Sequence, residues 1–180
     1  CSEGGILRTL VDEEWFDASA IAQAGNVQPH QMQSGFVALR PTAQISKWLT
    51  LAERADDDEY VESFKILETG VNDNVPFPAD AYETYISELY QQNRLVDGDH
   101  YVGGRQVDLG EIECPLLTIA ADRDNICPPD AARVLNDLAG SQDTEYLHVS
   151  GGHVGALVGS RGPRTLYPKI GDWFGEKLAD

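Results

Sequence analysis

Two short loops of this sequence carry side chains that could do acid–base chemistry together. The first is the turn at 121–125, which holds Asp122 and Asp124 and directly follows an apolar run. The second is the glycine-rich stretch at 150–155, which holds His153. A carboxylate bonded to an imidazole fixes its tautomer, and the imidazole can then take a proton from a nucleophile. Asp124 and His153 are therefore the candidate catalytic pair.

Each residue of this pair also has an ordinary structural interpretation. Asp124 could cap its own turn, and His153 could bond to nearby backbone. Their joint placement, acid before histidine and each just past a strand, favours the catalytic interpretation. Asp122 is the rival acid and ranks second because it is closer to the strand end. The other histidines lack such a partner in the sequence pattern, and the last of them lies in a strand pattern and is interpreted as structural: His30, His100 and His148.

The segment that carries the two loops alternates strand and helix. An almost wholly apolar run at 114–121 predicts a strand that is buried on both faces. A helix opened by prolines is predicted at 131–138, and a second strand at 144–149. This order predicts an α/β fold with a parallel sheet, in which adjacent strands are ~5 Å apart and their carboxyl ends meet at one edge. A closing amphipathic helix is predicted at 163–178, with four residues facing inward: Leu166, Ile170, Trp173 and Phe174.

The pattern before residue 93 is mainly helical. Asp17 is the predicted cap of a short helix that ends at Gly25, and helical spacing of apolar residues resumes from Pro41. We therefore predict a helical lid or cap region at 1–93 and a C-terminal α/β core at 94–180, which together form one partial catalytic domain. A sheet of two or three strands is about half of a complete α/β domain. The lid is expected to pack over the His153 loop and to be less ordered than the core.

The charge balance excludes several function classes. Thirty acidic and 13 basic residues give a net charge of −17 in 180 residues. A field of that sign repels nucleic acids and anionic lipid surfaces. An ordinary acidic protein and one adapted to a high-salt cytoplasm both fit this composition. No apolar run approaches the ~20 residues of a membrane span, so no span is predicted.

The three cysteines are too few and too scattered for a disulfide framework or a zinc site. We expect no metal, no resident cofactor and a reducing, cytoplasmic setting. Cys114 begins the predicted buried strand and is expected to be structural. Cys127 lies in the aspartate loop and is expected to pack rather than react.

Several motifs together resemble polyhydroxyalkanoate synthases of the α/β-hydrolase superfamily. Residues 115–129 look like the stretch that holds their catalytic aspartate, and 151–155 resemble their catalytic-histidine motif. The similarity covers nearly all 180 residues and is closest to the class III type, which works with a second subunit. The segment between lid and core matches at 76–78, 89–95 and 104–109.

The resemblance implies an acyltransferase. Such enzymes move a 3-hydroxyacyl group from coenzyme A to a cysteine thiolate on a nucleophile elbow, and the hydroxyl of a second unit then attacks the thioester. His153 would be the general base, and Asp124 would either orient it or serve the hydroxyl. The implied substrates are 3-hydroxyacyl-CoA and the growing polyester. The implied setting is a homo- or hetero-oligomer with a second synthase subunit, in the cytoplasm or at the surface of polyester granules.

The nucleophile is the missing part of this pattern. The family's elbow reads Gly-x-Cys-x-Gly-Gly, and only residues 2–5 imitate its right half, with Ser2 at the nucleophile position. Lid-like sequence follows within 15 residues, whereas the family places tens of residues there. We therefore expect a cysteine upstream of residue 1, with Cys1 and Ser2 as bystanders. The alternatives are an esterase or intracellular polyester depolymerase, which a serine elbow would favour, and a non-catalytic truncated module that binds a granule or a partner.

Overall fold

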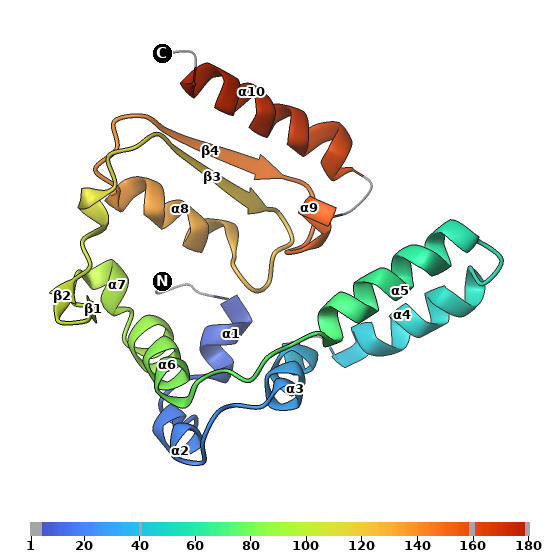
Figure 1. The fold of residues 1–180 in the computed structure, drawn as a ribbon, viewed down its shortest axis with the longest axis horizontal. Coiled ribbons are helices and arrows are strands. Elements are labelled where there is room, and N and C mark those ends of the chain that lie inside the picture. Colours follow the sequence, from blue (N-terminus) through green and yellow to red (C-terminus); the bar gives the residue numbers. More distant parts are fainter. Residues whose placement is uncertain (1–4, 40, 159–160, 179–180) are drawn as a thin grey trace. The chain divides into compact units, whose positions relative to one another are not determined.

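The computed structural model describes residues 5–39, 41–158 and 161–178. Their contacts form two compact units, a helical unit at 17–85 and a sheet unit that combines 5–16 with 86–178 (Figure 1). This division differs from the predicted boundary at residue 93, because 5–16 and 86–93 belong to the sheet unit. One cause is the side chain of Gln91, whose Nε2 donates hydrogen bonds to the carbonyls of Val11 at 2.8 Å and Phe16 at 3.0 Å.

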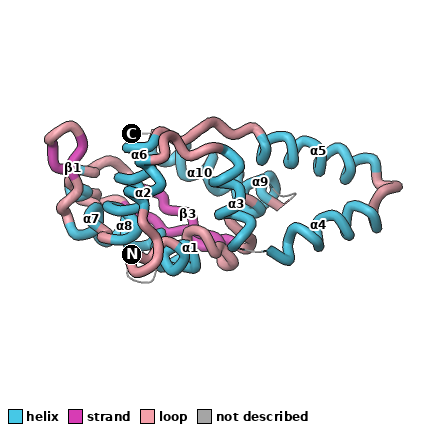
Figure 2. Tube along the Cα trace, turned by 90° about the horizontal axis from the view of Figure 1, so that it is seen from below, coloured by secondary structure: helices cyan, strands magenta, loops and turns pink. Residues whose placement is uncertain are grey.

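The sheet unit is built on two parallel strands, β3 (Leu116–Ala121) and β4 (Thr144–Val149). They pair in register from Leu116 opposite Thr144 to Ala121 opposite Val149. Helix α8 (Pro129–Leu138) connects them and packs on the pair, and α10 (Tyr167–Lys177) lies on the other side of it (Figures 1 and 2). The predicted α/β class and the order of these elements are confirmed.

Burial in this unit is shallower than the sequence predicts. In β3 only Ala120 and Ala121 are buried, because β4 is its one paired neighbour among the described residues. Burial of the whole strand on both faces is therefore a wrong prediction for these residues. Leu166 is buried as expected, whereas Phe174 is 52% exposed, with its ring edge to face against that of Trp173.

Short elements complete the sheet unit. Gly103 and Gly104 have positive φ angles and form the predicted turn of a small antiparallel hairpin. A π-helix, η1, precedes this hairpin, and a second one, η3, precedes α10. The bounds are α1 Gly5–Leu10, η1 Tyr85–Gln91, α7 Arg94–Asp97, β1 Tyr101–Val102, β2 Arg105–Gln106, η2 Leu109–Glu111, α9 Gly155–Val158 and η3 Gly162–Leu166.

The helical unit confirms the predicted cap at Asp17, whose carboxylate accepts the Ala20 N–H at 2.9 Å. In the same unit, Val27 and Phe77 pair through their backbones as an isolated antiparallel β-bridge. The sequence pattern does not predict one helix, α3, because the stretch contains Gly35 and its apolar residues form only a weak helical face. The bounds are α2 Ala18–Gln23, α3 Pro29–Leu39, α4 Pro41–Glu53, α5 Asp58–Asn72 and α6 Ala79–Thr84.

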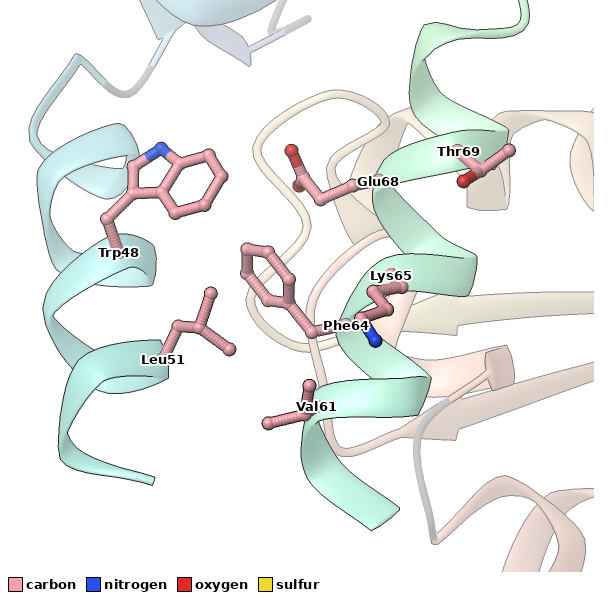
Figure 3. A pocket seen from close by; sticks show the side chains of 7 residues that line it. All are labelled: Trp48, Leu51, Val61, Phe64, Lys65, Glu68 and Thr69. Atoms are coloured by element: carbon pink, nitrogen blue, oxygen red, sulfur yellow. The ribbon is translucent and has the colours of Figure 1, made fainter. Parts of the chain in front are cut away.

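Helices α4 and α5 form a hairpin with very little core. Neither helix has a buried residue. Trp48 and Phe64 meet edge to face with 5.2 Å between ring centroids, and an apolar groove of about 330 Å³ lies between the helices (Figure 3). Several apolar side chains of the hairpin remain exposed: Ile45, Trp48, Leu49, Ile66, Leu67 and Val71.

Candidate active site

Asp124 lies in the loop that directly follows β3. Its Oδ1 accepts the backbone N–H groups of Ile126 and Cys127, both at 2.9 Å. These bonds form because the chain turns sharply before Pro128, and an Asp side chain readily caps such a turn. The side chain is only 8% exposed. The structural interpretation of Asp124 as a turn cap is therefore correct, and it accounts for one of the two carboxylate oxygens.

The other oxygen of Asp124 meets His153. The distance from Oδ2 to the ring Nδ1 is 2.8 Å, within the range expected for a hydrogen bond between the two predicted residues. His153 stands in the loop after β4, and the parallel pairing of β3 and β4 brings the two loops together. The imidazole is 45% exposed, whereas the carboxylate that it meets is 8% exposed.

The hydrogen bonds also decide the tautomer of His153. Burial by itself would raise the pKa of Asp124, but the N–H of Cys127, the His153 ring and the N–H of Ile126 outweigh it, and the pKa lies below its usual value. The carboxylate is thus ionised at neutral pH and can only accept a hydrogen bond. Nδ1 of His153 must therefore donate, and in the neutral imidazole Nε2 is then the unprotonated nitrogen.

Asp122, the rival acid, is bound elsewhere. Its Oδ1 accepts the Gly151 N–H at 2.8 Å, and its Oδ2 accepts the Ser150 hydroxyl at 3.2 Å. The ranking of Asp124 above Asp122 as the partner of His153 therefore agrees with the geometry. The sequence pattern did not predict that Asp122, in the loop after β3, would bind the loop after β4. The signal that could have found it is a Ser-Gly pair just before the histidine, which offers two donors to a nearby carboxylate.

One expectation about the remaining histidines is wrong. His100 does have an acidic partner, since its Nδ1 lies 2.8 Å from Oε2 of Glu88. The residue is 8% exposed, and Arg94 contacts the other oxygen of the same carboxylate at 3.4 Å. The pair escaped the sequence analysis because Glu88 belongs to the π-helix η1, 12 residues away, and no strand-end pattern marks it. His148 lies on β4, is exposed and stacks against Tyr146.

No candidate thiol or hydroxyl for the nucleophile stands out in the described residues. Cys114 is exposed and precedes β3 by two residues, so its interpretation as a buried strand residue is wrong. Burial and the neighbouring Asp124 charge raise the pKa of the Cys127 thiol, which disfavours a reactive thiolate. Within the described ranges, no Ser or Cys side chain is hydrogen-bonded to the His153 ring. Cys1 and Ser2 lie outside the described residues.

Groups of three or more His, Cys, Asp or Glu side chains that could hold a metal ion do not occur in the described part of the chain. In the same part, every helix is too short or too polar to cross a lipid bilayer. The Asp124–His153 pair itself offers acid–base chemistry. It can hold a proton acceptor at Nε2 and stabilise the imidazolium that forms when the proton arrives.

Comparison with known proteins finds a matching family profile and several similar proteins. A family profile described as the PHB de-polymerase C-terminus matches residues 17–177. The chain is 34% identical over 176 residues to a poly(3-hydroxyalkanoate) polymerase subunit PhaC of Haloferax mediterranei, covering 97% of the chain and 36% of that protein. It is 29% identical to a subunit of the same name from Haloarcula marismortui, with 97% and 37% coverage.

A third relative is the poly(3-hydroxyalkanoate) polymerase subunit PhaC of Allochromatium vinosum. It is 31% identical over 159 residues, which cover 88% of the chain and 45% of that protein. The chain thus spans less than half the length of each of these three relatives. The family profile covers both units of the chain, including Asp124 and His153.

Proposed function

The chain belongs to the PHB de-polymerase C-terminus family, and from this premise we propose that it supplies the acid–base pair of a poly(3-hydroxyalkanoate) polymerase. The observation that carries the proposal is the 2.8 Å hydrogen bond between Asp124 and the His153 ring. Relatives named as polymerase subunits support the reaction class. The substrates are 3-hydroxyacyl-CoA and the end of the growing polyester.

The reaction proceeds in two acyl transfers. In the first, Nε2 of His153 takes the proton of a cysteine thiol, the sulfur attacks the thioester carbonyl, and the bond to the coenzyme A sulfur breaks. The proton then goes to the departing coenzyme A thiolate. In the second, His153 takes the proton of a chain-end hydroxyl, whose oxygen forms the new ester bond. The enzyme thiolate leaves and regains the proton.

Asp124 acts on His153 rather than on the substrate. Three donors already face its two oxygens, the side chain is 8% exposed, and its lowered pKa makes it a weak base. These properties suit a group that orients the ring and stabilises the imidazolium. They argue against the alternative in which Asp124 itself deprotonates the hydroxyl. Asp124 is thus a positioning residue, and His153 is the catalytic base.

The nucleophile in this proposal is a cysteine outside residues 5–178. Cys127 is disfavoured in this role because burial and the Asp124 charge raise the pKa of its thiol. The work of the described chain is then to present Nε2 to a thiol from elsewhere in the protein. A second subunit, assembly into oligomers and action in the cytoplasm at a granule surface are further parts of the proposal.

A hydrolase on the same scaffold is the second candidate, and the description of the family as a depolymerase favours it. The same Asp–His pair would then activate a serine, and water would replace the chain-end hydroxyl in the second step. Fold and acid–base pair are common to both reactions. The difference lies in the nucleophile and in whether water reaches the acyl-enzyme.

The deciding experiment uses the protein expressed from its complete reading frame. It is incubated with 3-hydroxybutyryl-CoA, and released coenzyme A and insoluble polyester are measured together. Hydrolysis of a soluble 3-hydroxybutyrate oligomer is measured in parallel. We expect one polymerised unit for nearly every coenzyme A released and slow oligomer hydrolysis. Oligomer hydrolysis without polymer formation would contradict the proposal and establish the hydrolase.

A further inference from the structure

The loop that presents His153 makes hydrogen bonds of its own at its C-terminal end, where the Gly152 carbonyl accepts the Ala156 N–H and the Val154 carbonyl accepts the Leu157 and Val158 N–H groups, all at 3.0 Å. It leaves β4 at Val149 and reaches the histidine through two glycines, Gly151 and Gly152. Glycines add backbone freedom rather than restraint. These local bonds hold the end of the loop that leads into α9, whereas its start at Ser150 and Gly151 is held by contacts from outside the loop.

Those contacts come from the neighbouring aspartate loop and converge on Ser150 and Gly151. The Gly151 N–H donates to Asp122 Oδ1 at 2.8 Å, and the Gly151 carbonyl accepts the Arg123 N–H at 2.9 Å. The Ser150 hydroxyl donates to Asp122 Oδ2 at 3.2 Å. Both oxygens of Asp122 thus bind the histidine loop, while the backbone of the next residue binds it from the other side.

The carboxylate is in the right state for this task. The Gly151 N–H, followed by the Ser150 hydroxyl and the Arg123 charge, holds the pKa of Asp122 below its usual value against the opposing effect of burial. An ionised carboxylate accepts stronger hydrogen bonds than a neutral group does. A Cβ added at Gly151 would also lie about 3.0 Å from the backbone of Ala156, so a residue larger than glycine would fit there only if Ala156 shifted.

We propose that Asp122 is a positioning residue of the active site, a clamp that fixes the histidine loop so that His153 meets Asp124. This inference rests on the proposed function of the Asp124–His153 pair. Asp122 holds the backbone two residues before the ring, and Asp124 holds the ring itself. The two aspartates of one turn therefore divide the work, one fixing where the loop lies and the other fixing how the imidazole points.

The test is a double-mutant cycle in the protein made from its complete reading frame, with coenzyme A release as the assay. Asp122→Ala should lower kcat by roughly ten- to a hundredfold with little change in KM, since a displacement of about 1 Å at a catalytic group has such a cost. In an Asp124→Ala background the same change should cost less than about threefold, because the pair it serves is already broken. A loss below tenfold alone, or an equal loss in both backgrounds, would overturn the proposal.

Conservative and control variants separate positioning from general damage. Asp122→Asn keeps an acceptor for the Gly151 N–H and should retain most of the activity that Asp122→Ala loses. If it fails as badly as Ala, the carboxylate acts by its charge and the positioning role is wrong. Asp137→Ala removes the same charge from the exposed face of α8 and should leave kcat unchanged.

One readout is independent of turnover and of whether Asp122→Ala folds well. Hydrogen exchange at the Gly151 amide is followed by NMR at neutral pH. Compared with the unsubstituted protein, exchange should be at least about tenfold faster in Asp122→Asn, whose amide oxygen is a weaker acceptor, and faster still in Asp122→Ala. Unchanged exchange would overturn the clamp even in an active enzyme. If instead exchange responds but the unsubstituted protein releases no coenzyme A, the clamp stands and the proposed function fails.

Discussion

The sheet unit contains two histidine–carboxylate pairs with the same hydrogen-bond length. The two pairs differ in which partner, the ring or the carboxylate, is exposed to solvent. His153 and Asp124 are 2.8 Å apart, with the ring 45% exposed and the carboxylate 8% exposed. His100 and Glu88 are also 2.8 Å apart, with the ring 10% exposed and the carboxylate 27% exposed. In the first pair the acid is hidden and the base is open. In the second the base is hidden.

This difference separates a pair that can do chemistry from one that holds the fold. A general base must reach the proton of its substrate, which requires an open ring nitrogen. The His100 ring has little access to solvent, and Arg94 shares its carboxylate. Its bonds connect η1 to the start of β1, so its contribution is to stability. A short His–carboxylate distance alone is therefore a poor sign of catalysis.

The largest predicted effect is on turnover at the open pair. Asp124→Asn keeps the shape of the side chain but removes the charge that sets the tautomer of His153. We expect kcat for coenzyme A release to fall by about 10²–10⁴, the range of general-base contributions. Circular dichroism should show an unchanged fold. An activity within threefold of the unsubstituted protein would mean that the pair is not the catalytic base.

The buried pair should respond in stability instead. His100→Ala leaves the Glu88 carboxylate without its closest partner, which typically costs about 1–3 kcal/mol of unfolding free energy. The measurement is urea unfolding followed by tryptophan fluorescence. His153→Ala, at a half-exposed position, is the matched control and should cost less. A larger loss for His153→Ala would reverse our assignment of the two roles.

A third prediction concerns pH. Because the folded-state pKa of Asp124 lies below its ordinary value of 3.8, the ionised group stabilises the folded protein above that value. This contribution is lost as the pH falls through the lower, folded-state pKa. The unfolding free energy of the unsubstituted protein should thus exceed that of Asp124→Asn near pH 6–7, and the difference should shrink below about pH 4. A difference that grows on acidification would contradict the assigned direction.

The α4–α5 hairpin offers the smallest and most local effect. Neither helix has a buried residue, whereas β3 ends in two buried alanines. Amides of the hairpin should therefore exchange with solvent at least about tenfold faster than those of β3 and β4. Hydrogen exchange with mass spectrometry measures both segments at once. Equal protection would show that the hairpin is fixed core, and slower exchange with a bound acyl-CoA analogue would support a role as lid.

The sequence predicts those parts of the site that depend on local signals. The apolar run of β3, the prolines before α8 and the spacing of Asp124 and His153 after two strands all lie in short stretches of chain. Parallel pairing then brings the two loops together without further information. The cap of α2 at Asp17 is predictable for the same reason.

Other features depend on distant contacts and leave no such signal. Glu88 lies in the π-helix η1 and meets His100 from 12 residues away, and the sequence pattern predicts neither the π-helix nor the contact. Asp122 resembles a turn residue until the next strand places Ser150 and Gly151 beside it. Phe174 fits the helical spacing of the apolar residues near the C-terminus, yet it is 52% exposed.

The most direct test of the central claim compares the two histidines in one assay. His153→Gln and His100→Gln are made in the protein expressed from its complete reading frame, and coenzyme A release from 3-hydroxybutyryl-CoA is measured per folded molecule. Glutamine keeps a polar side chain but cannot accept the proton. We predict a loss of at least about 10² for His153→Gln and less than about threefold for His100→Gln. Equal losses, or a larger loss at His100, would contradict the assignment of His153 as the catalytic base.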